Sequence, residues 1–454
     1  MKRPFDIPWW GMLLGVAVFW MNLGLSAAEG QEAALERLWK LALKNNPAVQ
    51  SQRLQVEQAR RQLKFQRRER LPKLHSSASY SYVSEIPEFR LPFTVPSFPA
   101  VNITAGTHRR YDFAATVEQP LFTGWRLTRQ VQAARYSVAA REGQMRARRN
   151  ALLFQVGGLY YQILLNRLQA KTLAQAIGRT ELHLRRARSL LATAQATAFD
   201  TLEVANRKLQ LLSQLKRLRD SGKILQAKLA RLLGGKEVSV PEPGNGAGLT
   251  AAKIPPLDSL LALALRRRPE LQAFRAARRA QKARAGAARS LYFPQIYGSF
   301  SYHYARPGVN FFRDEWMSYY TAGVGLKWSL WNWGQRRLQV QQAELAVRQA
   351  ALQERDFENR VAEEVREAYY HLLSLRDQLE LQKRLVSQER ERYRLARSRY
   401  SQGLATSLDL SDAEKTLLSA ELTQKQFWVQ WQVVWLQLRL ATGTIGSNTD
   451  LAAK

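Results

Sequence analysis

The 454-residue chain contains no cysteine. It therefore cannot form a disulfide scaffold, a cysteine-ligated zinc site, an iron–sulfur cluster or a thiol nucleophile, and it offers no cysteine for a bacterial lipid anchor. Histidine is also scarce, and no HExxH motif or nucleophile–base motif occurs. We therefore expect no metal site, no cofactor and no enzymatic activity. The five histidines are scattered: His75, His108, His183, His303 and His371.

Acidic residues are few, since 37 Asp and Glu stand against 69 Lys and Arg and leave a formal net charge of +32. Such a balance is typical of proteins that bind nucleic acid or anionic surfaces. With 46% hydrophobic residues, the chain can nevertheless bury a substantial core. Charge alone does not decide the class of protein.

The N-terminus has the three parts of a secretory signal. Lys2 and Arg3 precede an apolar run from Trp9 to Leu25, and the small residues 26–28 follow it. The run is short for a transmembrane helix, which needs ~20 apolar residues. We predict a cleaved signal peptide at residues 1–28, with a retained anchor as the alternative. Export argues against binding to chromosomal DNA.

The remainder of the chain consists of two copies of one repeat. Residues 38–47 match residues 260–269 at an offset of 222, and the offset becomes 209 further along. The difference of 13 residues is an insertion in the first copy, in the Pro-rich stretch between residues 83 and 110. We expect a first repeat at 29–235, a Gly/Pro-rich linker at 236–256, a second repeat at 257–443 and a tail at 444–454.

Each copy contains a predicted strand pair, at about 73–83 and 110–120 and at about 294–304 and 318–330. Apolar or aromatic residues alternate there with small or polar ones, the signature of transmembrane β-strands. A half-buried soluble sheet is the alternative. Four strands cannot close a barrel, so several chains must share one; three chains would supply twelve strands. One alternating row is Ile296, Gly298, Phe300, Tyr302 and Tyr304.

A long helical hairpin follows each strand pair, at about 125–235 and 334–443. No proline interrupts the first long helix of either hairpin, which at ~1.5 Å per residue makes a rod of roughly 100 Å. A coiled-coil seam is expected in both copies. Its members are Leu153, Val156, Tyr160 and Ile163 in the first copy and Ala362, Val365, Tyr369 and Leu372 in the second.

These motifs together resemble the outer-membrane efflux protein family, the TolC type of export duct. The resemblance covers nearly the whole chain after residue 28 and rests on four motifs: Leu41-Ala42-Leu43-x-Asn45-Asn46-Pro47, Gln119-Pro120-Leu121-Phe122-x-Gly124, Tyr160-Tyr161 and Tyr400-x-x-Gly403-x-x-Thr406-x-x-Asp409. The second copy departs at the strand exit, where it reads Leu330-Trp331-Asn332-Trp333-Gly334.

The resemblance implies an α+β membrane protein built from a duplicated helix–β-hairpin–coiled-coil hairpin unit. It further implies a homotrimer in outer-membrane lipid, with a 12-stranded barrel continuing into a periplasmic α-helical barrel. Its partners would be a periplasmic adaptor (membrane fusion) protein and an inner-membrane pump of the RND, ABC or MFS type, with no nucleic acid. Such ducts conduct drugs, metals or proteins passively, so the cargo stays open.

The resemblance also assigns roles to the hairpin tips. Asp409 and Asp412 would form an acidic ring at the periplasmic entrance; helix capping alone is the alternative explanation for Asp409 and Asp200. Tyr400 would hydrogen-bond Asp200 in the neighbouring hairpin and help to close the channel. The arginine that the family carries nearby is replaced by Ala405. The expected adaptor contacts are Gly403, Leu404, Ala405 and Thr406 in one tip and Ala196, Thr197 and Ala198 in the other.

Two other interpretations compete with the duct. A secreted basic coiled-coil protein that binds nucleic acid or anionic surfaces would explain the charge and the heptads, but not the duplicated strand pairs. A periplasmic enzyme would require a catalytic constellation that the sequence lacks. For a duct, the charge fits either an acidic external medium or a basic lumen that favours anionic cargo.

Overall fold

A computed structural model describes residues 33–90, 102–104, 106–240 and 254–446. The predicted signal peptide lies outside these residues, as do most of the predicted linker and tail. Within the described ranges, no helix has the length and apolarity needed to cross a membrane.

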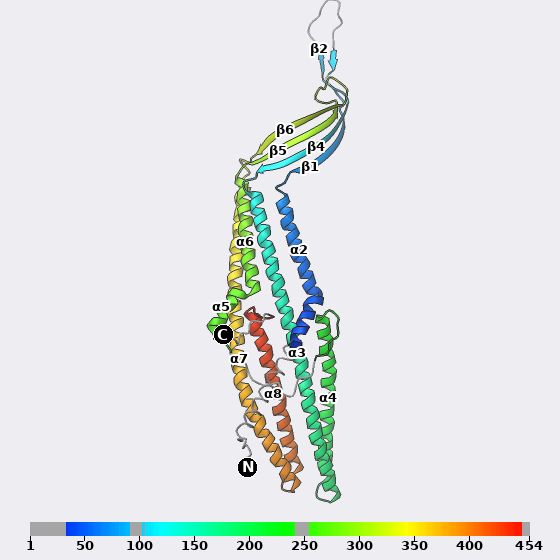
Figure 1. The fold of residues 1–454 in the computed structure, drawn as a ribbon, viewed down its shortest axis with the longest axis vertical. Coiled ribbons are helices and arrows are strands. Elements are labelled where there is room, and N and C mark those ends of the chain that lie inside the picture. Colours follow the sequence, from blue (N-terminus) through cyan, green and yellow to red (C-terminus); the bar gives the residue numbers. More distant parts are fainter. Residues whose placement is uncertain (1–32, 91–101, 105, 241–253, 447–454) are drawn as a thin grey trace, which may run out of the picture. The chain divides into compact units, whose positions relative to one another are not determined.

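Both copies have the same order of elements (Figure 1). The first comprises α2 (Pro47–Arg68), β1 (Lys73–Tyr82), β4 (Arg109–Phe122), α3 (Arg126–Ala192) and α4 (Ala198–Leu232). The second comprises α6 (Pro269–Arg289), the turn η1 (Ser290–Tyr292), β5 (Gln295–Arg306), β6 (Met317–Lys327), α7 (Gln335–Ser401) and α8 (Ser407–Ala441). The long helices α3 and α7 have 67 residues each, and the returning helices α4 and α8 have 35 each. The duplicated unit inferred from the sequence is thus confirmed.

Four further elements precede or interrupt this order. Residues 33–45 are helical and lead into α2. The helix α5 (Leu257–Arg267) stands in the corresponding place before α6. The insertion of the first copy contains a small antiparallel pair, β2 (Glu88–Arg90) with β3 (Asn102–Thr104), which the sequence did not predict.

The four main strands form one antiparallel sheet in the order β1-β4-β5-β6. Because side chains alternate along a strand, the register assembles one apolar and one polar face. On the apolar face, Leu74 lies opposite Val117, Val117 opposite Phe300 and Phe300 opposite Ala322. On the polar face, Thr116 and Ser301 share a hydrogen bond of 2.9 Å between their hydroxyls. The apolar face is exposed in the single chain, with 73% of Val324 accessible.

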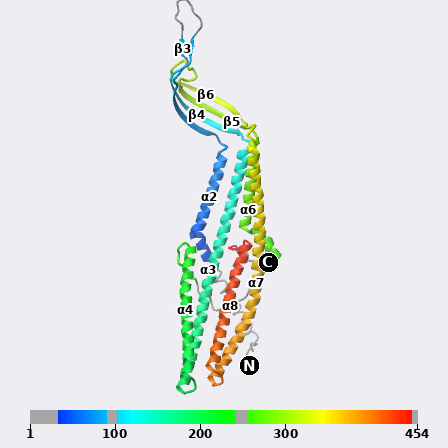
Figure 2. The same cartoon turned by 180° about the vertical axis from the view of Figure 1, so that it is seen from behind.

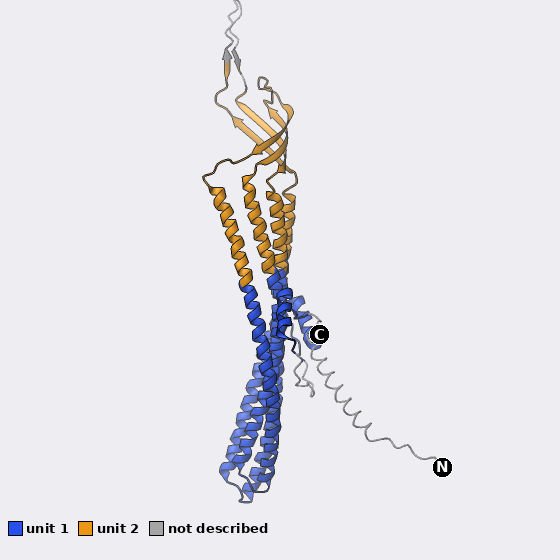
Figure 3. Cartoon of the chain, turned by 90° about the vertical axis from the view of Figure 1, so that its left-hand side faces the viewer, with its two compact units in different colours: residues 1–54, 143–272, 356–454 blue, residues 55–142, 273–355 orange. Residues whose placement is uncertain are grey.

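The chain divides into two compact units, and each contains parts of both copies (Figure 3). One unit, residues 55–142 and 273–355, holds the sheet and the helical segments that enter and leave it. The other, residues 1–54, 143–272 and 356–454, holds both helical hairpins, which Figure 2 shows side by side.

The core of the hairpin unit contains the seam of the first copy as predicted: Leu153, Val156, Tyr160 and Ile163 are all buried. The indole of Trp39 donates a 2.9 Å hydrogen bond to the carbonyl of Leu153 and ties the first helix to this core.

The seam of the second copy is rotated relative to the prediction. Ala362 and Tyr369 are only partly buried. Val361 and Ala368 are fully buried in their place and join the correctly predicted Val365 and Leu372. Apolar residues occupy neighbouring positions in this part of α7, so the spacing of 3 and 4 could be satisfied by two overlapping stripes.

Candidate functional site

The ends of the two helical hairpins carry the residues singled out from the sequence. The first hairpin end is defined here as residues 183–205 and the second as residues 392–414. An offset of 209 relates them residue by residue. Both lie in the same compact unit.

Each returning helix begins with the same capping box. The Asp200 carboxylate accepts hydrogen bonds from the backbone N–H and hydroxyl of Thr197, at 2.9 and 2.7 Å. Asp409 accepts the same pair from Thr406 at the same distances. Reciprocal capping satisfies donors at the helix start that have no partner within the helix. The bonds hold the pKa of Asp200 and of Asp409 below the usual range.

The turns before the caps differ in one respect. Gly403 adopts a φ of +75° in the second turn, where a Cβ would meet no neighbour within 4 Å. Ala194 occupies the equivalent position of the first turn with a φ of +55°. A left-handed conformation is easy for glycine and costs other residues about 1–2 kcal/mol.

Apolar side chains project from both ends. Leu404, one of the expected adaptor contacts, is 66% exposed, and Phe199 is 73% exposed. Leu202 and Leu408 are also exposed. The sequence analysis did not single out Phe199, Leu202 or Leu408, although Phe199 adjoins the predicted Ala198 and Leu408 adjoins the predicted Asp409. Several exposed large side chains in one place are typical of a protein contact surface.

The two predicted entrance carboxylates are both engaged within the chain. Asp409 caps α8. Asp412 forms an ion pair with Arg392 on α7, in which the guanidinium donates a 2.7 Å hydrogen bond to the carboxylate. Both remain at the exposed surface.

Tyr400 is buried at the second hairpin end. Its ring meets the His183 imidazole edge to face, with 5.1 Å between the centroids. Its hydroxyl has no hydrogen-bond partner among the described residues, and no described bond joins it to Asp200. Burial raises the pKa of Tyr400, the nearby Ser407 side chain opposes this shift, and the negative charge of Asp200 adds to it.

His183 is buried between the hairpins, a position that no sequence pattern predicted. Its Nε2 shares a 3.2 Å hydrogen bond with the Ser407 hydroxyl at the start of α8. Its Nδ1 is buried with no partner among the described residues. Burial lowers the pKa of His183 to about 4, against the weaker attraction of Asp200. The side chain is therefore neutral at physiological pH.

Glu414 is a second buried titratable group between the hairpins. It accepts a 3.1 Å hydrogen bond from the Thr180 hydroxyl on α3. Burial raises the pKa of Glu414 to about 7, although the Thr180 bond and nearby arginines oppose the shift. About two helical turns further along α8, Glu421 pairs with Arg179 at 3.2 Å and with Arg390 at 3.4 Å.

With the duplicated fold and the capped tips established, comparison with known proteins decides the family. The sequence matches the family described as "Outer membrane efflux protein" over residues 38–235 and 260–444. The chain belongs to the outer membrane efflux protein family. Its members are outer-membrane channels, not enzymes, and their helices extend into the periplasm.

Individual relatives align along most of the chain. The probable outer membrane lipoprotein SilC of Salmonella typhimurium is 24% identical over 90% of this chain and 85% of its own. The outer membrane protein OprJ of Pseudomonas aeruginosa is 26% identical over 91% and 84%. The Campylobacter jejuni CmeC outer membrane channel has the same fold, with a TM-score of 0.75, 16% identity and coverage of 92% and 88%.

This efflux protein is therefore an outer-membrane efflux channel. The competing interpretation as a secreted nucleic-acid-binding protein is set aside, because the family match includes both strand pairs and both hairpins. No group of three or more potential metal ligands occurs in the described ranges.

Proposed function

We propose that three copies of this chain form one channel, which receives cargo from a periplasmic adaptor and an inner-membrane pump and conducts it passively outward. The sheet carries this proposal. Its outer strands β1 and β6 have no pairing partner beyond their inner neighbours in the described chain. Unpaired strand edges are not tolerated in lipid, so neighbouring chains are required to close the sheet.

Absence of cysteine makes this arrangement directly testable. A Ser77→Cys/Thr321→Cys variant places one thiol on each outer strand, and a flexible bis-maleimide links only engineered thiols. We expect cross-linked species of two and three chains and none larger. The two single-cysteine variants are the controls. Each carries a thiol on only one outer strand, so the reagent cannot link β1 of one chain to β6 of the next. A ladder that continues beyond three chains, or none at all, contradicts the closed trimer.

The hairpin ends are proposed to contact the adaptor. Their exposed apolar side chains, Leu404 and Phe199 above all, support this role. A photo-cross-linking residue at position 404 should capture the adaptor in cells. The same residue at Leu345, equally exposed but in the other compact unit, should not. Equal capture at both positions contradicts the proposal.

Asp409 and Asp412 are proposed to line the entrance, where six carboxylates from three chains would attract multivalent cations. Asp409→Asn with Asp412→Asn should weaken block of single-channel current by a trivalent cation. The matched control is Asp200→Asn with Glu203→Gln, the equivalent positions of the first hairpin end. Unchanged block in the first variant excludes the ring.

Tyr400 is proposed to help hold the entrance closed through its hydroxyl, which has no partner among the described residues and is available to hydrogen-bond Asp200 of the neighbouring hairpin. Tyr400→Phe removes only the hydroxyl and should raise the frequency of channel opening. Tyr393→Phe, on the same helix two turns away, is the control. Identical opening in wild type and Tyr400→Phe means that the tyrosine is a packing residue.

A further inference from the structure

The helix α6 carries an excess of positive charge that its surroundings do not neutralise. It contains six basic residues and one acidic residue, Glu270. Glu354 pairs with both Arg275 and Arg278, and Glu344 pairs with Arg289. The other three cations, Arg279, Lys282 and Arg284, have neither an ion pair nor a hydrogen bond in the part of the chain that the structure describes.

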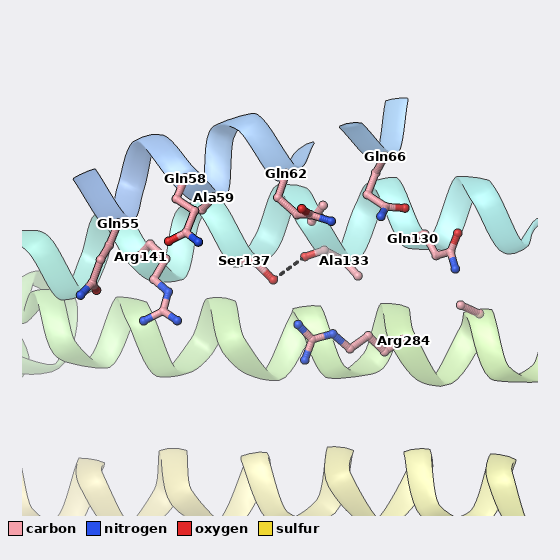
Figure 4. A pocket seen from close by; sticks show the side chains of 12 residues that line it. Gln55, Gln58, Ala59, Gln62, Gln66, Gln130, Ala133, Ser137, Arg141 and Arg284 are labelled. Atoms are coloured by element: carbon pink, nitrogen blue, oxygen red, sulfur yellow. Dashed lines mark hydrogen bonds between the residues drawn. The ribbon is translucent and has the colours of Figure 1, made fainter. Parts of the chain in front are cut away.

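One of these cations, Arg284, borders a groove of about 780 Å³ between α2, α3 and α6 (Figure 4). Small side chains create the hollow: Ala59, Ala133, Ala134 and Ala287. Its remaining lining consists of amide, hydroxyl and guanidinium groups, from Gln55, Gln58, Gln62, Gln66, Gln130, Ser137, Arg141 and Arg284. No carboxylate lines it. All of these residues belong to the unit that holds the sheet.

A second hollow connects the groove with the polar face of the sheet. Arg284 and Ala287 line the groove, and Leu291 lies in the turn η1 that directly follows α6. Leu291 lines a second hollow at the strand ends, together with Glu118, Gln295 and Lys327. Those three side chains belong to the polar face, because Glu118 follows Thr116 by two residues and Gln295 pairs with Lys327. In a closed barrel, the polar face is the face toward the lumen.

The chemistry of the lining selects a class of ligand. Guanidinium groups bind carboxylate and other oxyanions with charge-assisted, often bidentate hydrogen bonds. The glutamine amides offer donors and acceptors together. An oxyanion that also carries hydroxyl groups matches both features.

We propose that this groove is a binding subsite for organic oxyanions, such as hydroxycarboxylates, in transit through the channel. The inference rests on the proposed trimeric channel and names a cargo class for it. Three grooves per trimer would raise the local concentration of anions along the wall, as a lining of one charge sign does in a cleft. A shallow, open groove suits this role, because conduction requires binding weak enough to allow release.

The test is block of single-channel potassium chloride current by citrate in planar bilayers. Citrate should reduce the wild-type current. Because one charge-assisted bond is lost, Arg284→Gln should raise the half-blocking citrate concentration at least about tenfold, which corresponds to about 1.4 kcal/mol. The matched control is Arg279→Gln, which removes one equally unpaired positive charge from the same helix outside the groove and should change this concentration less than about twofold.

The outcomes separate the two levels of the proposal. Channels that conduct potassium chloride but are not blocked by citrate overturn the subsite and leave the channel intact. Equal loss of block in both variants assigns the effect to net charge and also overturns the subsite. Failure of the wild-type protein to form channels overturns the trimeric channel itself.

Discussion

The two hairpin ends have the same length, the same capping box and the same cap distances, yet they differ at residues through which they contact each other. His183 of the first end is buried, whereas the equivalent Arg392 of the second is exposed and paired with Asp412. Glu414 of the second end is buried opposite Thr180, and its equivalent in the first is Ala205. Local features of the duplicated unit were retained, and its contact surfaces diverged.

The divergence places two oppositely shifted titratable groups in one interface. Folding keeps His183 neutral and also favours the neutral form of Glu414. A buried neutral side chain needs no partner of opposite charge. His183 is neutral at neutral pH, whereas Glu414 is neutral at acidic pH. The predictions below test this difference between the ends, beginning with the largest effect.

His183 should destabilise the hairpin ends as the pH falls. Its pKa is about 4 in the folded protein and near 6.5 when unfolded, so the unfolded state binds more protons between these values. His183→Gln retains a hydrogen-bonding group and removes the titration. Relative to wild type, the local stability of this variant should rise by about 2–3 kcal/mol between pH 7 and pH 4. Hydrogen-exchange protection factors of residues 183–205 measure this change; a difference independent of pH contradicts it.

Glu414 should act with the opposite sign. Its pKa of about 7 lies above the unfolded value of 4.5, so the folded state binds more protons between them and stability falls as the pH rises. Glu414→Gln preserves the bond to Thr180 and should gain about 2–3 kcal/mol relative to wild type between pH 4.5 and pH 7.5. The same exchange measurement on residues 392–414 reads this gain, and an exposed control, Glu380→Gln, should show none.

Substitutions at the two turn residues should change local stability in opposite directions. Gly403→Ala forces a Cβ into the left-handed conformation of the second turn and should cost about 1 kcal/mol. Ala194→Gly relieves the same conformation in the first turn and should gain up to about 1 kcal/mol. Local exchange rates at each turn are the measurement. A loss of stability in Ala194→Gly would show that the first turn is not strained.

The two caps should contribute equally. Thr197→Ala and Thr406→Ala each remove a reciprocal cap and should each cost about 1 kcal/mol of helix stability. Thr→Ser at either position retains the hydroxyl and serves as the control. Because the hydrogen-bond distances agree, a difference above about 0.5 kcal/mol between the two alanine variants would mean that tertiary contacts, not the cap, determine the effect.

Much of the fold could be predicted from the sequence because its signals are local or repeated. Strand alternation indicated both strand pairs, and the offset of 209 related the hairpins and their capping residues. The predicted buried face of α7 was wrong at Ala362 and Tyr369, because two overlapping rows of apolar residues satisfy the same spacing there. The small sheet β2–β3 was missed because its three-residue strands are too short for a periodic signal.

The buried groups of the hairpin ends could not be predicted. Nothing near His183 in the sequence distinguishes it from an exposed histidine; Ser407 and Tyr400, its neighbours, lie more than 200 residues away. The groove shows the same limit. The glutamines at 55, 58, 62 and 66 follow helical spacing, but the alanines that hollow out the groove come from α2, α3 and α6. Tertiary contact, not local pattern, creates both features.

The native mass of the mature protein, extracted from membranes in detergent, tests the central claim most directly. Analytical ultracentrifugation with correction for bound detergent measures the number of chains in the particle. The account predicts a mass of three chains, because four strands per chain leave two edges that only neighbouring copies can close. A water-soluble monomer or dimer that needs no detergent would contradict the shared channel.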